Sequence, residues 1–110
     1  MRRGEIYLAD LGAPVGHEQS LTRPVLVISA QPWLDSQPPV VTVLPLTRTR
    51  RGSATHVEIE KGESGLQETS YIRCEDARAI SPIRLGRQLG SAAAGVVVQV
   101  EAILRRLLAL

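Results

Sequence analysis

The aliphatic run Val25-Leu26-Val27-Ile28, entered through Arg23 and Pro24, constrains the fold of this chain more than any other stretch. A continuous run of this kind is typical of a central strand that is buried on both faces. Pro24 lacks an N–H and fixes its own φ, so it belongs at the start of a strand or on an edge. Because a residue that precedes proline is biased to extended geometry, Arg23 is expected at the lip of this strand. The run predicts a buried strand over residues 24–29 with a cation at its entrance.

Further short segments show the alternation or the β-rich composition of strands. The predicted strands cover residues 5–10, 40–46, 55–60, 69–74, 78–80 and 85–89, and one helical turn is expected within 31–39. Pro45 is expected to place its strand end at an edge or a bulge. In the strand over 55–60, His56 is expected to point outward as an ordinary surface residue. Short strands in this number predict a mainly β fold, a small coiled antiparallel sheet or barrel.

A terminal helix is expected to cap this sheet. Ser91 is a suitable N-cap residue, and Glu101 and Arg105 have the spacing of an i,i+4 ion pair. Apolar residues at helical spacing predict one stripe that packs on the sheet: Val97, Val100, Leu104 and Leu107.

Length and composition bound the function classes. The 110 residues predict a single domain over 1–110, and 44% hydrophobic residues without any Phe require a core of Val, Leu, Ile and Ala. Cys74 is the only cysteine and His17 and His56 are the only histidines, which argues against an intramolecular disulfide and a dedicated metal site. No cofactor is expected. Neither a signal-peptide core nor a membrane-length apolar run is present, so we expect a cytoplasmic protein without membrane association.

The loop before the buried strand concentrates polar chemistry. It supplies an imidazole, a carboxylate and an amide from His17, Glu18 and Gln19, and Arg23 adds a rigid five-donor cation at the strand entrance. A guanidinium can bind two phosphate oxygens at once. The combination indicates a site that grips a phosphodiester, although an ion pair between Arg23 and Glu18 explains the same two residues.

The same stretch resembles the signature of the MazF/PemK/Kid toxin family. The similarity rests on Gly16-His17-Glu18-Gln19, on Thr22-Arg23-Pro24-Val25-Leu26-Val27-Ile28, and on the opening Arg3-Gly4-Glu5-Ile6-Tyr7-Leu8-Ala9-Asp10-Leu11. The resemblance implies an SH3-like barrel with a C-terminal helix, shared by MazF-type toxins and CcdB. It also implies a sequence-specific, metal-independent endoribonuclease that causes growth arrest. RNA would be cut by attack of its own 2′-OH, leaving 2′,3′-cyclic phosphate and 5′-hydroxyl ends on single-stranded substrates.

The resemblance assigns the central roles within this site. Arg23 matches the family's catalytic arginine, and we expect it to stabilise the charge of the transition state. Thr47 resembles the Thr or Ser at the equivalent strand end, which contacts the scissile phosphate, although a turn or cap role is equally consistent with its position. Arg73-Cys74-Glu75 resembles the Arg-Cys-Asp of Kid, in which the Arg and the Asp are linked to cleavage. Glu75 is one methylene longer than that Asp, and Asp76 is the alternative residue for its role. Cys74 itself is expected in the core.

The general base stays open at this stage. His17 is the motif side chain that titrates near neutrality, and it is either an auxiliary catalyst or an RNA contact. Glu18 is a second candidate base, and Gln19 either reads a base edge or holds the loop. We expect RNA contacts from four arginines, although a solvated turn or surface ion pairs would also explain them: Arg48, Arg50, Arg73 and Arg78.

The resemblance also implies binding partners, and two alternative functions stay open. The implied partners are a second copy of the chain in a homodimer and a MazE-like antitoxin with a disordered acidic tail, with DNA contacted only through the antitoxin. A CcdB-like gyrase poison would share the fold without enzymatic activity. That class kills through a terminal-helix Trp, whereas this chain ends Arg105-Arg106-Leu107-Leu108-Ala109-Leu110. A binding module without activity is the third reading, and Arg23 and Thr47 argue against it.

Overall fold

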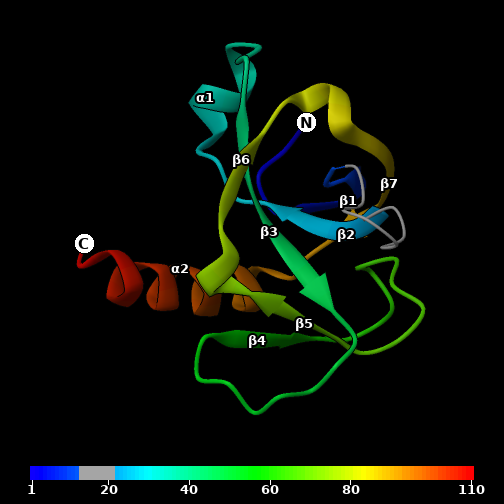
Figure 1. Ribbon diagram of the computed structural model, residues 1–110, viewed down its shortest axis with the longest axis vertical. Helices are drawn as coiled ribbons and strands as arrows, with labels where there is room; N and C mark the ends of the chain where they lie inside the picture. The colour runs from blue at the N-terminus through cyan, green and yellow to red at the C-terminus, as the bar shows by residue number, and fades with distance from the viewer. Residues whose placement is uncertain (13–21) are drawn as a thin grey trace.

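The computed structural model describes residues 1–12 and 22–110. It contains a coiled antiparallel sheet, one long C-terminal helix and one short helix (Figure 1). The strands are β1 (Glu5–Asp10), β2 (Thr22–Val27), β3 (Val41–Thr47), β4 (His56–Ile59), β5 (Ser70–Arg73), β6 (Arg78–Ile80) and β7 (Leu85–Ser91). The helices are α1 (Gln31–Asp35) and α2 (Ala94–Leu108), with three-residue 3₁₀ turns at Cys74–Asp76 and Pro82–Arg84.

Strand β3 is the hub of the sheet. The strand order is β4-β5-β3-β2-β1-β7, and β6 pairs with β3 beside β5. Residues 41–43 of β3 pair with β6 and residues 46–47 pair with β5, so Pro45 falls in the gap between these two partners. The carbonyl of Thr42 accepts from the N–H of Ile28 beyond the end of β2, so the odd-numbered residues of β3 turn their backbone groups away from β2. Pro45 is therefore tolerated in a central strand because its missing N–H faces the gap.

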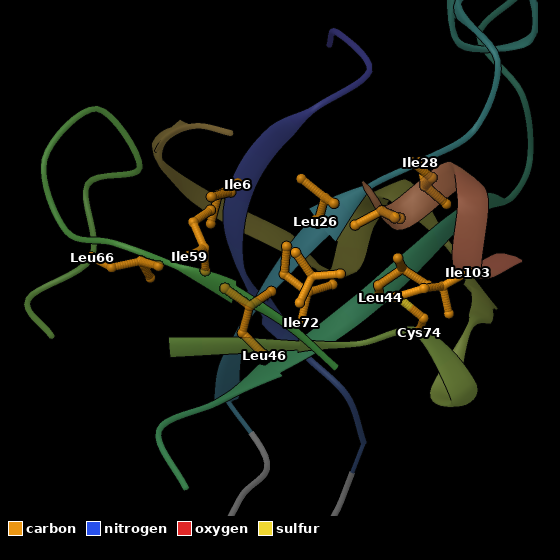
Figure 2. Packing of buried hydrophobic residues seen from close by; sticks show 12 residues of the cluster. Ile6, Leu26, Ile28, Leu44, Leu46, Ile59, Leu66, Ile72, Cys74 and Ile103 are labelled. Carbon is orange, nitrogen blue, oxygen red and sulfur yellow. The ribbon is translucent and has the colours of Figure 1, made fainter. Parts of the chain in front are cut away.

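Two apolar clusters cover the two faces of the sheet. On one face α2 packs through Val100 and Ile103 against residues such as Leu26 and Leu44 (Figure 2). On the other face a smaller cluster gathers around Val25 and lies next to α1. Its buried members are Ala9, Leu11, Val25, Val27, Leu34, Val41, Val43 and Ile80. Because β2 and β3 contribute to both clusters, their aliphatic runs are buried on both faces. The sequence predicted this for the run in β2.

A close backbone approach joins the two ends of the sheet. The segment that follows β4 packs on β7, and the N–H of Ser91 donates to the carbonyl of Glu63 at 2.9 Å. A Cβ on Gly65, which has φ +72°, would lie 1.8 Å from the carbonyl oxygen of Leu89. A Cβ on Gly90 would lie 2.2 Å from the carbonyl oxygen of Glu63. Only glycine at both positions permits this contact.

The predicted fold class is confirmed, and three local predictions are wrong. Ser91 ends β7, whereas α2 begins after Ala93 without a side-chain cap. Glu101 pairs with Arg3 Nη1 at 2.8 Å in place of Arg105, because α2 lies beside the N-terminal segment. Pro45 occupies a central strand for the reason given above. Among the described residues, no helix is both long enough and apolar enough to cross a membrane.

Gly90→Ala tests the contact between the sheet ends. We expect the free energy of unfolding to fall by about 2 kcal/mol or more, because the new methyl group clashes with fixed backbone atoms. Gly95→Ala is the matched control, since a Cβ at Gly95 meets nothing within 4 Å and alanine favours the helix. Chemical denaturation should show a loss for the first variant and no loss for the second. Equal stabilities would contradict this packing.

Candidate nucleic-acid interface

Arg23 and Thr47 emerge side by side from the two central strands. Val25 lies opposite Pro45, and continuing this register to the strand ends sets Arg23 opposite Thr47. Residues that face each other in an antiparallel pair project to the same side of the sheet. Both side chains therefore lie on the face opposite α2, beyond the apolar cluster around Val25. The buried strands thus deliver a cation and a hydroxyl to one solvent-facing edge.

A cavity of about 340 Å³ opens at this edge. Arg23, Thr47 and Arg48 line it together with Gln67 and Ser70. The Oγ1 of Thr47 accepts from the N–H of Thr49 at 3.2 Å, so the hydroxyl also serves the turn, and among residues 1–12 and 22–110 its own proton has no acceptor. The arrangement brings together three of the predicted site residues, Arg23, Thr47 and Arg48.

A second cavity, of about 510 Å³, is also lined by Arg23. Its charged lining comes from Arg23, Arg73, Glu75, Asp76 and Arg78. Arg23 is the residue that lines both cavities. The two hollows thus share one arginine, and each has further guanidinium groups in its lining.

Two carboxylates hold Arg73 in the second cavity. Its Nη2 lies 2.5 Å from Asp76 Oδ2 and its Nε lies 3.6 Å from Glu75 Oε2. The Nε is buried and lacks a hydrogen-bond partner among the described residues. Sequence reasoning left phosphate contact and surface ion pairs as alternatives for Arg73, and the structure shows ion pairs to both acids. The side chain remains 34% exposed, so the guanidinium is still open to the cavity.

A hydrogen-bond network holds the carboxylate of Glu75 in place. Its Oε2 lies 2.9 Å from Nε2 of His56, and its Oε1 accepts from the hydroxyl of Thr55 at 2.8 Å. Burial raises the pKa of Glu75, but hydrogen bonds from His56, its own backbone and Thr55 outweigh that effect and lower the pKa to about 2. A carboxylate with so low a pKa is a weak base, so Glu75 is suited to holding neighbours in place.

The outward, surface role predicted for His56 is wrong. His56 lies directly opposite Arg73 in the β4–β5 pair, and its side chain is only 5% exposed. The Glu75 carboxylate and the neighbouring strand cover the ring. Alternation along β4 correctly assigns His56 to the face opposite Val57 and Ile59, but that face is itself covered here.

The other predicted arginines line the same face without strong partners. Arg48 Nε lies 3.7 Å from Glu68 Oε2, and both side chains are more than 60% exposed, a geometry worth little to stability. Arg78 lies opposite Val43 and lines the second cavity. Arg50 lines a separate hollow of about 190 Å³ with His56, Glu58 and Tyr71.

The remaining predicted residues fall elsewhere. His17, Glu18 and Gln19 lie outside the described residues, and with them the predicted Arg23–Glu18 ion pair. Within the described part of the chain, Arg23 forms no ion pair. Cys74 is buried in the core, as predicted, and burial with the nearby Glu75 raises its pKa to about 11. The thiol is therefore neutral and inert.

The described face can bind a phosphate chain. Arginines present planar sets of donors to both cavities, and an open, polar and cationic surface of this kind recognises phosphate oxygens. Guanidinium groups stay protonated at any working pH and supply charge stabilisation. Glu75 and Asp76 meanwhile neutralise part of the charge around Arg73, leaving Arg23 as the cation that both hollows share.

Comparisons with known proteins point in one direction. The family described as PemK-like, MazF-like toxin of type II toxin-antitoxin system matches residues 2–108. Endoribonuclease MazF of Staphylococcus saprophyticus is 38% identical over 90 residues, which cover 81% of this chain and 75% of that protein. The solved Mycobacterium tuberculosis toxin MazF-mt6 has a TM-score of 0.80 at 28% identity, covering 96% of this chain and 97% of that one. A mycobacterial endoribonuclease in complex with its cognate antitoxin also has a TM-score of 0.80, at 25% identity, covering 98% and 94%.

An acid titration tests the network around Glu75. Because its pKa falls from 4.5 to about 2 on folding, its stabilising contribution is complete above pH 4.5 and is lost as the pH falls toward 2. We expect Glu75→Gln to lower the melting temperature near neutral pH, and the gap from the wild-type protein to shrink below pH 4.5. Glu68→Gln, which removes an exposed ion pair, is the control and should change little. A gap that stays constant with pH would contradict the assignment.

Proposed function

This chain belongs to the family of PemK-like, MazF-like toxins of type II toxin-antitoxin systems, and from that premise we propose that it cuts single-stranded RNA with the RNA's own 2′-OH as nucleophile. The presence of Arg23 in the lining of two cavities is the observation that carries the proposal. Chain cleavage needs a cation at one phosphate and room for a nucleotide on each side of it. The activity is sequence-specific and independent of a metal ion.

The reaction needs little covalent chemistry from the protein. The 2′-oxygen attacks the phosphorus and the bond from phosphorus to the 5′-oxygen breaks. The proton of the 2′-OH goes to a base, and the departing 5′-oxygen takes up a proton. The products are a 2′,3′-cyclic phosphate and a 5′-hydroxyl end. In-line positioning and stabilisation of charge on the phosphoryl oxygens supply most of the rate.

Each described residue has a role that its position supports. Arg23 binds the scissile phosphate and stabilises the charge that develops on it. We do not assign it the role of base, because a guanidinium stays protonated and has no free lone pair to accept a proton. The hydroxyl of Thr47, opposite Arg23, donates to a phosphoryl oxygen. Arg48, Arg73 and Arg78 contact neighbouring phosphates from the two cavities, and Arg50 extends this surface.

The general base comes from outside the described residues in this proposal. Both oxygens of Glu75 are already engaged by His56 and Thr55, and its pKa is lowered to about 2, so we assign it a holding role. His17 carries an imidazole and Glu18 a carboxylate in the same loop, so these two are the candidates. Gln19 reads a base edge or holds that loop.

The partners follow from the family and the charge of the face. One structural relative is an endoribonuclease in complex with its cognate antitoxin, and we propose a MazE-like antitoxin for this chain as well. An acidic disordered segment would complement the exposed arginines Arg23, Arg48 and Arg78 and cover both cavities. The toxin acts as a cytoplasmic homodimer in this proposal, and it reaches DNA only through the antitoxin.

Arg23→Ala tests the catalytic assignment. Purified protein is incubated with a long single-stranded RNA in excess EDTA, and new 5′ ends are mapped. We expect discrete cuts from the wild-type protein and a rate lower by on the order of a hundred- to a thousandfold in the variant. Arg105→Ala removes an exposed arginine from α2 and should cleave at the wild-type rate.

Two outcomes would contradict the proposal. Undiminished cleavage by folded Arg23→Ala would remove the residue from the reaction. Intact RNA after incubation with folded, antitoxin-free wild-type protein would favour the gyrase-poison or pure-binding class instead.

A further inference from the structure

The side chain of His56 is buried beside Arg73. The two residues face each other across the β4–β5 pair, and only 5% of the His56 side chain is exposed. Its Nε2 contacts Glu75 Oε2, whereas its Nδ1 has no hydrogen-bond partner among the described residues. A buried imidazole with one unsatisfied nitrogen costs free energy, and a hydrophobic residue at this place in the sheet would avoid that cost. The single contact to Glu75 is what the histidine provides.

The Glu75 carboxylate links His56 to Arg73. One oxygen, Oε2, lies 2.9 Å from His56 Nε2 and 3.6 Å from Arg73 Nε. The other oxygen accepts from Thr55, whose carbonyl in turn accepts from the N–H of Cys74. Glu75 is thus fixed at both oxygens, on the 3₁₀ turn that directly follows Arg73. Asp76 on the same turn grips the far nitrogen of the guanidinium.

The contacts of Glu75 and Asp76 with Arg73, called the Arg73 bracket below, restrict where its guanidinium can lie. A free arginine side chain samples many rotamers, and ordering it costs up to about 2 kcal/mol. The Asp76 carboxylate at Nη2 and the negative charge of Glu75, 3.6 Å from Nε, restrict that freedom before substrate arrives. The side chain so held lines the cavity that Arg23 shares. Preorganised donors contribute to rate because they need no reordering in the transition state.

We propose that His56 is a positioning residue for RNA cleavage, which holds Glu75 so that Arg73 is fixed at the cavity it shares with Arg23. The proposal rests on the proposed nuclease function. His56 touches neither RNA nor the reacting atoms, and it acts through Glu75 and Arg73 alone. Its removal should therefore lower kcat more than it changes KM.

A double-mutant cycle tests this coupling. In His56→Leu an apolar side chain fills the space of the imidazole, but the contact to Glu75 is lost. We expect kcat to fall on the order of ten- to a hundredfold. His56→Gln retains an amide donor and should restore part of that loss. In an Arg73→Lys background, which keeps a cation but has no Nε–H to fix, His56→Leu should cause little further loss. Glu101→Gln breaks an arginine–carboxylate pair on the α2 face and should leave kcat unchanged.

If His56→Leu lowers kcat by the same factor in the wild-type and Arg73→Lys backgrounds, the role of His56 is merely structural and the proposal is overturned. A second readout does not depend on activity. The Nε proton of Arg73, followed by NMR, should exchange slowly with solvent in the wild-type protein and rapidly in His56→Leu. An unchanged signal would also overturn the positioning role. If the wild-type protein fails to cut RNA while the signal still depends on His56, the proposed function falls and the Arg73 bracket stands.

Discussion

The antiparallel pairing of β2 with β3 is the constraint on which the rest of the molecule depends. Val25, Leu26 and Val27 are fully buried, and so are their partners on β3. Because apolar side chains cover both faces of the pair, a register slip of one residue would move every side chain to the wrong cluster. The register is therefore rigid, and it fixes the polar residues at the strand ends, where Arg23 and Thr47 leave the core together.

The two faces of the sheet have different roles: one carries the main apolar core, and the other carries the candidate site. Helix α2 covers one face through a continuous apolar cluster (Figure 2). The other face is apolar only around Val25 and becomes polar toward the ends of β2, β3 and β5. Strand β6 and the end of β5 bring Arg78 and Arg73 to this polar half. A scaffold of this kind tolerates exposed cations at one edge because its stability comes from residues that they do not touch.

Much of this could be predicted from the sequence because it is encoded locally. The aliphatic run with Pro24 predicts a buried strand, and alternation predicts β1 and β4 within a residue or two of their observed bounds. Arg23 and Thr47 could be paired in advance because the family motif names both. The N-cap predicted at Ser91 is wrong, because Ser91 belongs to β7 and donates its N–H to the carbonyl of Glu63, which lies far away in sequence.

The contacts around Arg73 could not be predicted from the sequence. His56 and Arg73 lie opposite each other only because of the β4–β5 register, and no local pattern sets that register. Alternation places His56 away from the α2 core, which suggests solvent. Only the return of Glu75 over the ring, on the turn after β5, makes this a buried position.

In the proposed reaction the protein positions RNA's own 2′-OH for attack on a phosphate held at Arg23. Once the cleavage site in a single-stranded RNA is mapped, the same RNA can be made with a 2′-deoxy nucleotide immediately before the cut, and both substrates assayed in excess EDTA. We expect cyclic phosphate and 5′-hydroxyl ends from the first substrate and no cut in the second. Cleavage of the deoxy substrate, or 5′-phosphate ends from either one, would contradict this mechanism.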